Sequence, residues 1–349
     1  MSSQYRSHVM LAALAFALVL PCGVRAAPAT SDYALVDTLH LPGLTRWDCL
    51  TYDSKEHRLF ITRGESVDVL DVTTKKIVGS IPNTSGVHNV ALASEIGKGF
   101  ISNGKTNTVT VFDLTTLKPL ASAPTGTKPD VLVYDEPTQR VFVANGDSGD
   151  MTVLNAKDET VAATIKLDGQ PEFSVVDGKG KLYVNLEDKS QIAIVDTKEL
   201  KVIAHYNLSP SCEAPTGLAI DTDMNRLFAV CGNKVMVVVD GATGKIMDTL
   251  PIGASSDGAV FDAKTKLAFS SNGDGTLTVV GATSPDHYKV LQTVSTMPTA
   301  RTVTLDPAEH RLYLAAAETE GFDPPTEKHP QPRPHIKPDT FMILTVGQK

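Results

Sequence analysis

Seven positions that recur every 40 to 45 residues carry side chains that could bind a ligand. Four are carboxylates, and the others are a histidine, a threonine and an arginine: Asp48, His88, Asp130, Glu172, Thr216, Asp257 and Arg301. Carboxylates gathered at one place repel each other unless a cation, a salt bridge or water screens them. Calcium prefers such oxygen ligands, and a histidine among carboxylates also suits zinc or manganese. The pattern predicts a small-ligand or divalent-cation site, whose metal ligands would be Asp48, His88, Asp130, Glu172 and Asp257.

A sequence repeat is what would bring these positions together. Five residues after each position an aspartate usually stands, followed by a basic residue and a short apolar strand, as in Asp53 to Arg58 and Asp135 to Arg140. An alternating strand and a further outer strand follow in each copy. Short alternating segments bounded by Gly, Asp, Asn and Thr indicate antiparallel strands. Seven copies of four strands predict an all-β, seven-bladed β-propeller.

The two ends of the chain support this fold. The seventh copy ends with a third strand at residues 341–346 and has no fourth strand. A matching outer strand stands at the other end of the chain, at residues 33–41. We therefore predict that the N-terminal strand closes the last blade, which leaves no open sheet edge for aggregation.

In a propeller, the seven positions would surround one mouth of the central channel. The only tryptophan, Trp47, precedes Asp48 and should border the same mouth, either as a stacking surface or packed between blades. The alternative to a ligand site is that a channel mouth is simply wet and polar, because a fold does not by itself imply a function. The recurring aspartate lies at the opposite face and is interpreted as a turn residue.

The blade pattern resembles the YVTN-type repeat of the YncE-like β-propeller family over essentially the whole chain after the N-terminal segment. The segments that carry the resemblance are RWDCLTYD, SNGKTNTVTVFD, APTGLAID and SNGDGTLTVV. The resemblance implies a periplasmic or surface seven-bladed propeller, and it brings no catalytic residues.

One loop differs from its counterparts in the other blades. Residues 319–338 form a Pro-rich insertion in the seventh blade, a composition that favours an extended cover over a packed strand. If the insertion folds over the mouth, His329 or His335 could join the ring residues. The alternative is a solvated surface loop.

The cysteines fit an exported protein. Cys212 and Cys231 should reach the same face of the fifth blade, so we predict a disulfide between them. Cys49 has no histidine at a fixed sequence relation and is interpreted as a buried small residue rather than a nucleophile.

The N-terminus has the pattern of a secretory signal peptide over residues 1–26. Arg6 precedes an apolar run over residues 9–20, and small residues surround the expected cleavage site after Ala26. The mature chain, residues 27–349, would be a single domain in the periplasm. The apolar run is shorter than the roughly 20 residues that span a bilayer, so no integral membrane segment is expected after signal removal.

Charge and motifs narrow the function. The formal net charge is −8, which argues against a nucleic-acid partner. The motifs of serine hydrolases, zincins and P-loop enzymes are absent from the sequence. The first hypothesis is a binding or scaffold protein for a small ligand, a metal or an envelope protein. The alternative is a metal-dependent hydrolase of lactonase type, in which a cation polarises a carbonyl while a carboxylate or His88 moves protons.

Overall fold

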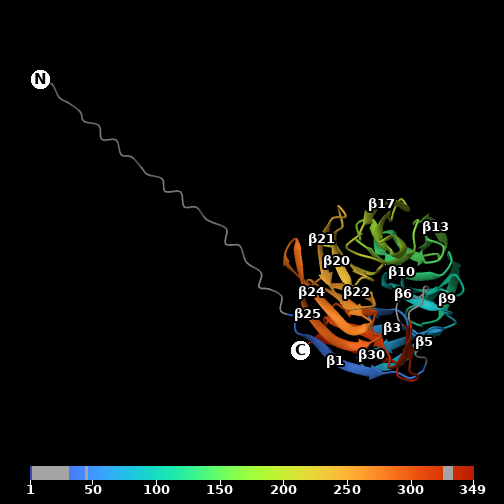
Figure 1. Ribbon diagram of the computed structural model, residues 1–349. Helices are drawn as coiled ribbons and strands as arrows, with labels where there is room; N and C mark the ends of the chain where they lie inside the picture. The colour runs from blue at the N-terminus through green and yellow to red at the C-terminus, as the bar shows by residue number, and fades with distance from the viewer. Residues whose placement is uncertain (2–30, 44–45, 325–332) are drawn as a thin grey trace.

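The structure is a computed structural model that describes residue 1 and residues 31–43, 46–324 and 333–349. Seven four-stranded antiparallel sheets follow one another around a ring (Figure 1). The seven-bladed propeller predicted from the repeat is confirmed. Residues 2–26 of the predicted signal peptide lie outside the described residues.

The blades are numbered along the chain, and each is given from its inner to its outer strand. Blade 1 contains β2 (Leu50–Asp53), β3 (Arg58–Thr62), β4 (Ser66–Asp71) and β5 (Lys76–Pro82), and blade 2 contains β6 (Val87–Ala93), β7 (Lys98–Asn103), β8 (Thr108–Asp113) and β9 (Pro119–Pro124). Blade 3 contains β10 (Pro129–Asp135), β11 (Arg140–Asn145), β12 (Asp150–Asn155) and β13 (Val161–Lys166), and blade 4 contains β14 (Pro171–Val176), β15 (Lys181–Leu186), β16 (Gln191–Asp196) and β17 (Lys201–Asn207). Blade 5 contains β18 (Pro215–Asp221), β19 (Arg226–Cys231), β20 (Val235–Asp240) and β21 (Ile246–Pro251), and blade 6 contains β22 (Ser256–Asp262), β23 (Leu267–Asn272), β24 (Asp274–Ser284) and β25 (His287–Pro298). Blade 7 contains β26 (Val303–Asp306), β27 (Arg311–Ala316), β30 (Met342–Gln348) and β1 (Tyr33–His40).

Strand β1 closes blade 7, as predicted. It pairs antiparallel with β30, from Tyr33 opposite Gln348 to His40 opposite Met342. In Figure 1 the blue β1 lies beside β30, so the first and last strands of the propeller meet in one sheet. The side chain of Gln292 on β25 exchanges two hydrogen bonds with the backbone of Tyr33, at 3.0 and 2.7 Å, which ties β1 to blade 6 as well.

The core is divided among the interfaces between blades. Apolar residues that alternate along the strands of one blade pack against those of the next, because both faces of each sheet are covered. The described residues form seven buried clusters, one at each interface. Phe60 of blade 1 and Phe112 of blade 2, for example, contact each other with ring centroids 5.6 Å apart. The packing fixes the angular position of every inner strand.

The recurring aspartate is a turn residue at the end of the inner strand. Asp53 accepts a hydrogen bond from the backbone N–H of Lys55 at 3.1 Å and pairs with Arg58 at 2.8 Å. Asp221 and Asp306 accept backbone hydrogen bonds in the same way. These carboxylates are buried in the turns, on the face opposite the mouth.

Helical structure within the described residues is confined to three single 3-10 turns: η1 (Ser94–Ile96), η2 (Glu136–Thr138) and η3 (Glu187–Lys189). No helix in the described part of the chain has the length and apolar character of a membrane span.

The Pro-rich insertion contains more regular structure than its composition predicts. Strands β28 (Thr319–Asp323) and β29 (Arg333–Ile336) pair antiparallel and extend from blade 7. The extended segment expected at residues 319–338 is therefore in part a paired hairpin, and its role as a cover over the mouth stays a prediction. Pro334 stands in β29, and a two-stranded hairpin has two edges at which the missing N–H needs no partner.

Candidate functional site

All seven predicted ring positions lie where an inner strand begins. His88, Asp130, Glu172, Thr216 and Asp257 are the second residues of β6, β10, β14, β18 and β22, and Asp48 and Arg301 stand two residues before β2 and β26. The inner strands of neighbouring blades contact one another around the axis. The propeller therefore brings these positions to one mouth of its channel, as the repeat predicts.

Three of the residues converge on one point. The Nδ1 atom of His88 lies 2.7 Å from Oδ2 of Asp48 and 3.6 Å from Oδ1 of Asp130. One potential ligand atom from each residue lies within 4.8 Å of those of the other two. Their side chains are 20 to 22% exposed, so they are accessible from the mouth yet largely enclosed.

The backbone under this group is held by contacts between blades. The N–H of Cys49 donates to the carbonyl of His88 at 3.1 Å, and the Thr302 hydroxyl donates to the carbonyl of Asp48 at 2.8 Å. The N–H of Asp48 donates to the Thr62 hydroxyl at 3.0 Å. Blades 7, 1 and 2 are thus connected directly at the site, which limits movement of its side chains.

A second charged pair lies across the mouth. Nε of Arg301 is 3.3 Å from Oδ2 of Asp257, whose side chain is 18% exposed against 52% for Arg301. The charge of Asp257 raises the pKa of Arg301 further above its ordinary value. Burial and the charge of Asp48 raise the pKa of Asp257, although Arg301 opposes them.

The carboxylates raise the pKa values of one another. Burial, together with the charges of Asp48 and Asp257, raises the pKa of Asp130 to about 6, against the opposing effect of His88. Burial raises the pKa of Glu172 to about 9, helped by the charges of Asp130 and Asp257. Glu172 therefore holds a proton at neutral pH when no cationic ligand is bound at the mouth.

His88 is balanced between opposing effects. Burial, the largest effect, lowers the pKa of its imidazole, but the hydrogen bond with Asp48 and the charges of Asp130 and Asp48 outweigh it. The net result is a raised pKa. The imidazole is therefore held between two carboxylates that both favour a positive charge at Nδ1.

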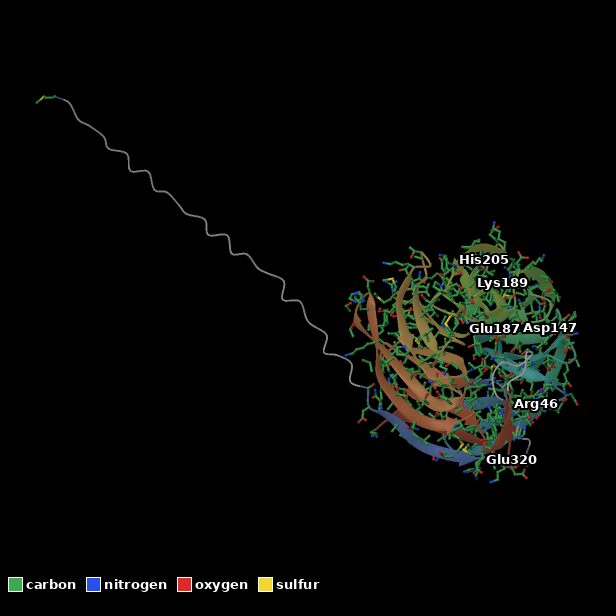
Figure 2. All side chains as sticks on the ribbon, viewed as in Figure 1. Arg46, Asp147, Glu187, Lys189, His205 and Glu320 are labelled. Carbon is green, nitrogen blue, oxygen red and sulfur yellow. A yellow bond between two sulfur atoms is a disulfide. The ribbon has the colours of Figure 1, made fainter. Side chains whose placement is uncertain are left out.

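Glu187 belongs to the same electrostatic cluster, although the sequence interpretation did not include it. Burial raises its pKa, and so does the charge of Asp257, while Lys128 opposes them. Its own charge helps to raise the pKa of Glu172. Figure 2 marks Glu187 on blade 4 and Asp147 on blade 3; Asp147 pairs with Lys128 at 3.7 Å.

The sequence repeat could have predicted that Glu187 lies at the mouth. The N–H of Glu187 donates to the carbonyl of Gln170 at 2.9 Å, and Gln170 stands two positions before Glu172, the ring residue of this blade. Four other blades make the same hydrogen bond from a glycine: Gly104, Gly146, Gly232 and Gly273. A Cβ added at Gly104 would lie 2.6 Å from Nε2 of His88, so this position faces the ring. A glutamate in place of glycine therefore adds a carboxylate to the mouth.

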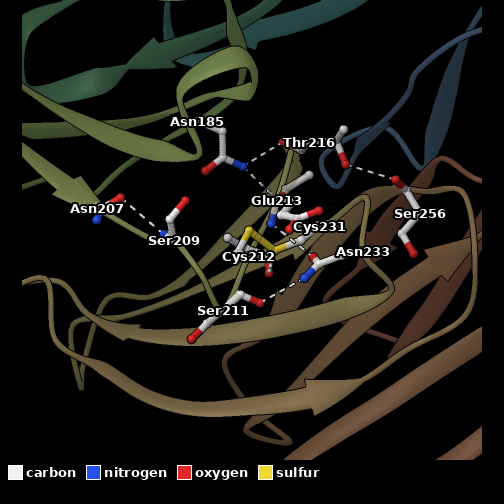
Figure 3. The surroundings of a disulfide bond; sticks show 12 residues. Asn185, Asn207, Ser209, Ser211, Cys212, Glu213, Thr216, Cys231, Asn233 and Ser256 are labelled. Atoms are coloured by element: carbon white, nitrogen blue, oxygen red, sulfur yellow. Dashed lines mark hydrogen bonds between the residues drawn. A yellow bond between two sulfur atoms is a disulfide. The ribbon is translucent and has the colours of Figure 1, made fainter. Parts of the chain in front are cut away.

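Thr216 contributes to the structure of the mouth rather than to its charge. Its hydroxyl donates to the carbonyl of Ser256 in blade 6 at 2.9 Å, and its own carbonyl accepts from the Asn185 side chain of blade 4 at 2.8 Å (Figure 3). Nearby, Cys212 and Cys231 form the predicted disulfide, with their Cα atoms 5.5 Å apart. The bond joins the loop before β18 to the end of β19.

Trp47 is half-buried and packs against the core. Its ring centroid lies 5.3 Å from that of Phe341, and it contacts the cluster between blades 7 and 1. Of the two alternatives from the sequence, the packing of Trp47 between blades is the one observed. Cys49 is buried, and burial and the charge of Asp48 raise the pKa of its thiol well above the ordinary value, which disfavours a nucleophilic thiolate.

The histidines of the insertion do not extend the observed cluster. Nε2 of His335 lies 2.6 Å from Oδ1 of Asp323 inside the β28–β29 hairpin, and this side chain is half exposed. No contact of His335 with a ring residue is found among the described residues. His329 lies outside the described residues.

The arrangement suits a positively charged ligand. Five carboxylates act on one another at the mouth, and the nearby positive groups are His88, Arg301 and Lys128. A cation at the mouth would reduce the repulsion among these carboxylates. Ligand sites in proteins are formed in this way, by a few polar groups that converge in a concave place.

Comparisons with known proteins show the fold alone. No protein-family model matches the sequence, and no curated protein matches it. A chain of hydrazine synthase from Kuenenia stuttgartiensis is similar in structure, with a TM-score of 0.68, 16% identity, and coverage of 79% of this chain and 94% of that one. U3-55K gives a TM-score of 0.73 at 10% identity, with 89% and 99% covered. A chain of the mitotic checkpoint complex gives 0.71 at 15% identity, with 88% and 96% covered.

Proposed function

We propose that this protein is an exported binding protein that takes up a small cationic ligand at the mouth of its central channel. The observation that carries the proposal is the electrostatic coupling of carboxylates from four blades. Burial, together with the charges of Asp130, Asp257, Glu187 and Asp48, raises the pKa of Glu172 to about 9, and neighbouring carboxylates also help to raise the pKa values of Asp130, Glu187 and Asp257. Folding brings so many carboxyl groups to the mouth that not all of them are ionised at neutral pH. A cation relieves that repulsion.

The geometry gives such a ligand both contact and access. The side chains of Asp48, Asp130 and Asp257 are 18 to 22% exposed, so a ligand can reach them while losing most of its water. Charged contacts in a partly enclosed site are stronger than on an open surface, because water screens them less. The backbone hydrogen bonds between blades hold the site in place before the ligand arrives.

An envelope location supports an extracytoplasmic ligand. The Cys212–Cys231 disulfide is consistent with an oxidising compartment, and the sequence pattern of residues 1–26 predicts export. The resemblance to YncE-like propellers agrees with this location. A soluble binding protein in the periplasm would meet metal ions and organic amines directly.

A hydrolase of lactonase type is the second candidate. One observation favours it: the carboxylate of Asp48 lies 2.7 Å from Nδ1 of His88 and orients the imidazole, as a carboxylate does for a general base. Hydrolysis of simple lactones that is lost in His88→Ala would support this candidate. Background rates at every substrate tested would remove it.

Calorimetric titration tests the binding function. The purified protein, stripped with a chelator, is titrated at low salt with divalent metals and with organic diamines. At least one of these cations should bind with one site per chain and should release protons, because Glu172 ionises when the cation enters. Glu172→Gln with Asp257→Asn should weaken binding by about tenfold or more.

The control is a carboxylate outside the cluster. Asp168 is 71% exposed and pairs with Lys166, so Asp168→Asn removes one charge without touching the mouth. Its affinity should stay within about twofold of the unmodified protein. If neither metals nor amines bind, or if Asp168→Asn weakens binding as much as the mouth variant does, the proposed function is wrong.

A further inference from the structure

At the mouth, a single imidazole nitrogen faces two carboxylates. Nδ1 of His88 lies 2.7 Å from Asp48 and 3.6 Å from Asp130. An imidazole nitrogen carries at most one hydrogen, so it can satisfy one of these carboxylates well. The hydrogen bond goes to Asp48. Among the described residues, no hydrogen bond reaches the carboxylate of Asp130.

We propose that Asp48, His88 and Asp130 form a site for a borderline divalent metal ion such as zinc, bound through Nδ1 and one oxygen of each carboxylate. This inference rests on the proposed function and names the class of cation. One imidazole nitrogen with two carboxylate oxygens is a donor set that zinc accepts and that calcium, which prefers oxygen ligands only, uses poorly. Three protein ligands leave a fourth position open to water or substrate.

The distances fit an ion of this size. Zinc bonds of about 2.0 to 2.1 Å at tetrahedral angles place the ligand atoms about 3.3 Å apart. The two distances from Nδ1, 2.7 and 3.6 Å, lie on either side of that value. The third pair of ligand atoms is within 4.8 Å. Side-chain rotations can provide the remaining adjustment without movement of the strands.

A glycine leaves room for the imidazole in this orientation. A Cβ at Gly104 would lie 2.6 Å from Nε2 of His88, closer than side chains pack, so only glycine at 104 permits the ring to stand as it does. The three ligands come from blades 1, 2 and 3, and the Cys49–His88 backbone hydrogen bond connects the first two blades at the site. His88 and Asp130 therefore lie in inner strands, and Asp48 lies two residues before one.

The other two residues of the predicted metal set have a different role. The charge of Asp257 acts on Asp130, and the charges of Asp130 and Asp48 act on Glu172, but Glu172 and Asp257 are not part of the group whose ligand atoms lie within 4.8 Å. They supply negative potential around the ion. Truncating them should lower metal affinity less than loss of a ligand does.

Cobalt gives a direct test, because Co²⁺ in a four-coordinate site of nitrogen and oxygen ligands absorbs visible light more strongly than hydrated Co²⁺. The purified, chelator-treated protein is titrated with Co²⁺, Zn²⁺ and Ca²⁺, and bound metal is counted by mass spectrometry. We expect one Zn²⁺ or Co²⁺ per chain, a visible cobalt band, displacement of cobalt by zinc, and Ca²⁺ bound at least about 100-fold more weakly. His88→Ala and Asp130→Asn should each lower zinc affinity by about 100-fold or more.

A second histidine offers a matched control. His310 lies at the opposite face and its Nδ1 is 2.6 Å from Oδ2 of Asp262, a pair with a single carboxylate. His310→Ala should leave the cobalt band and the zinc stoichiometry unchanged. Circular dichroism of each variant checks that the propeller is folded, and Asp130→Asn keeps the size of the side chain if His88→Ala does not fold.

The outcomes separate this inference from the proposed function. If organic amines bind at the mouth but zinc and cobalt do not, the metal site is wrong and the binding function stands. If no cation binds, both are wrong. Zinc binding that survives in folded His88→Ala and Asp130→Asn variants would place the metal elsewhere and overturn the inference.

Discussion

At the scale of single residues, the mouth shows how neighbours decide the charge of a side chain. Burial, together with the charges of carboxylates on its own and other blades, raises the pKa of Glu172 to about 9. Asp257, in the same mouth, has Arg301 at 3.3 Å to oppose the increase in its pKa. Among the described residues, two acids on equivalent strands therefore differ in their surroundings, because Asp257 has a salt-bridge partner and Glu172 has none.

Glu172 should make the stability of the metal-free protein depend on pH. Its pKa rises from an ordinary 4.5 to about 9 on folding, so between these values the folded state holds a proton that the unfolded state has released. This contribution to stability is complete below about pH 4.5 and is lost as the pH rises towards 9. Between pH 5 and 9, the free energy of unfolding should decrease less in Glu172→Gln than in the unmodified protein, by about 1 to 3 kcal/mol, as measured by urea unfolding.

The comparison variant for this experiment is Glu199→Gln, an exposed glutamate in the turn after β16. It should reproduce the pH profile of the unmodified protein. Parallel profiles for the unmodified protein and Glu172→Gln would show that Glu172 ionises normally in the folded state.

Glu187 provides a second residue-scale prediction. Because its charge acts on Glu172, Glu187→Gly, which restores the residue found in four other blades, should lower the pKa of Glu172. The carboxyl carbon resonance of Glu172, followed by NMR against pH, measures this directly. A shift to lower pKa is expected, and an unchanged midpoint would mean that the two side chains are not coupled.

At the scale of elements, the disulfide secures the loop that enters blade 5. Cys212 and Cys231 are 19 residues apart in sequence, and the inner strand β18 lies between them in the closed loop. That strand carries Thr216, which connects blades 5 and 6. The crosslink thus holds an inner strand in a blade whose ring residue is not ionisable.

Removing the disulfide should destabilise the protein without changing its site. A loop of this length corresponds to about 3 kcal/mol, so Cys212→Ser with Cys231→Ser should unfold at lower denaturant concentration by about 2 to 4 kcal/mol. Cation affinity at the mouth should stay within about twofold, because the charged cluster lies on other blades. Reductant added to the double variant should have no further effect, which controls for Cys49.

At the scale of the whole molecule, the ring depends on β1. This strand completes blade 7 and exchanges hydrogen bonds with Gln292 of blade 6. Without it, β30 would present an unpaired edge and the cluster that includes Tyr33 would lose its cover.

Moving β1 to the other end of the chain should preserve the fold. The N–H of Lys349 donates to the carbonyl of Asp32 at 3.0 Å, so residue 349 already lies beside the start of β1. A permuted chain that begins at Arg46 and continues from Lys349 through a short turn into residues 31–43 should fold and melt within a few degrees of the original. A chain that simply lacks residues 31–41 should aggregate, as measured by light scattering. An equally soluble and stable truncation would show that closure is dispensable.

Sequence periodicity alone determined the blade count, the closure by the N-terminal strand, the disulfide and the set of positions at the mouth. It could do so because a repeat places equivalent residues at equivalent backbone positions. The tertiary structure decided which side chains meet: His88 stands between Asp48 and Asp130, Thr216 is used in a bond between blades, and Trp47 packs on Phe341. It also added Glu187, whose counterparts in four blades are glycines. These choices depend on side-chain direction and on contacts between blades about 40 residues apart, which periodicity along the chain does not specify.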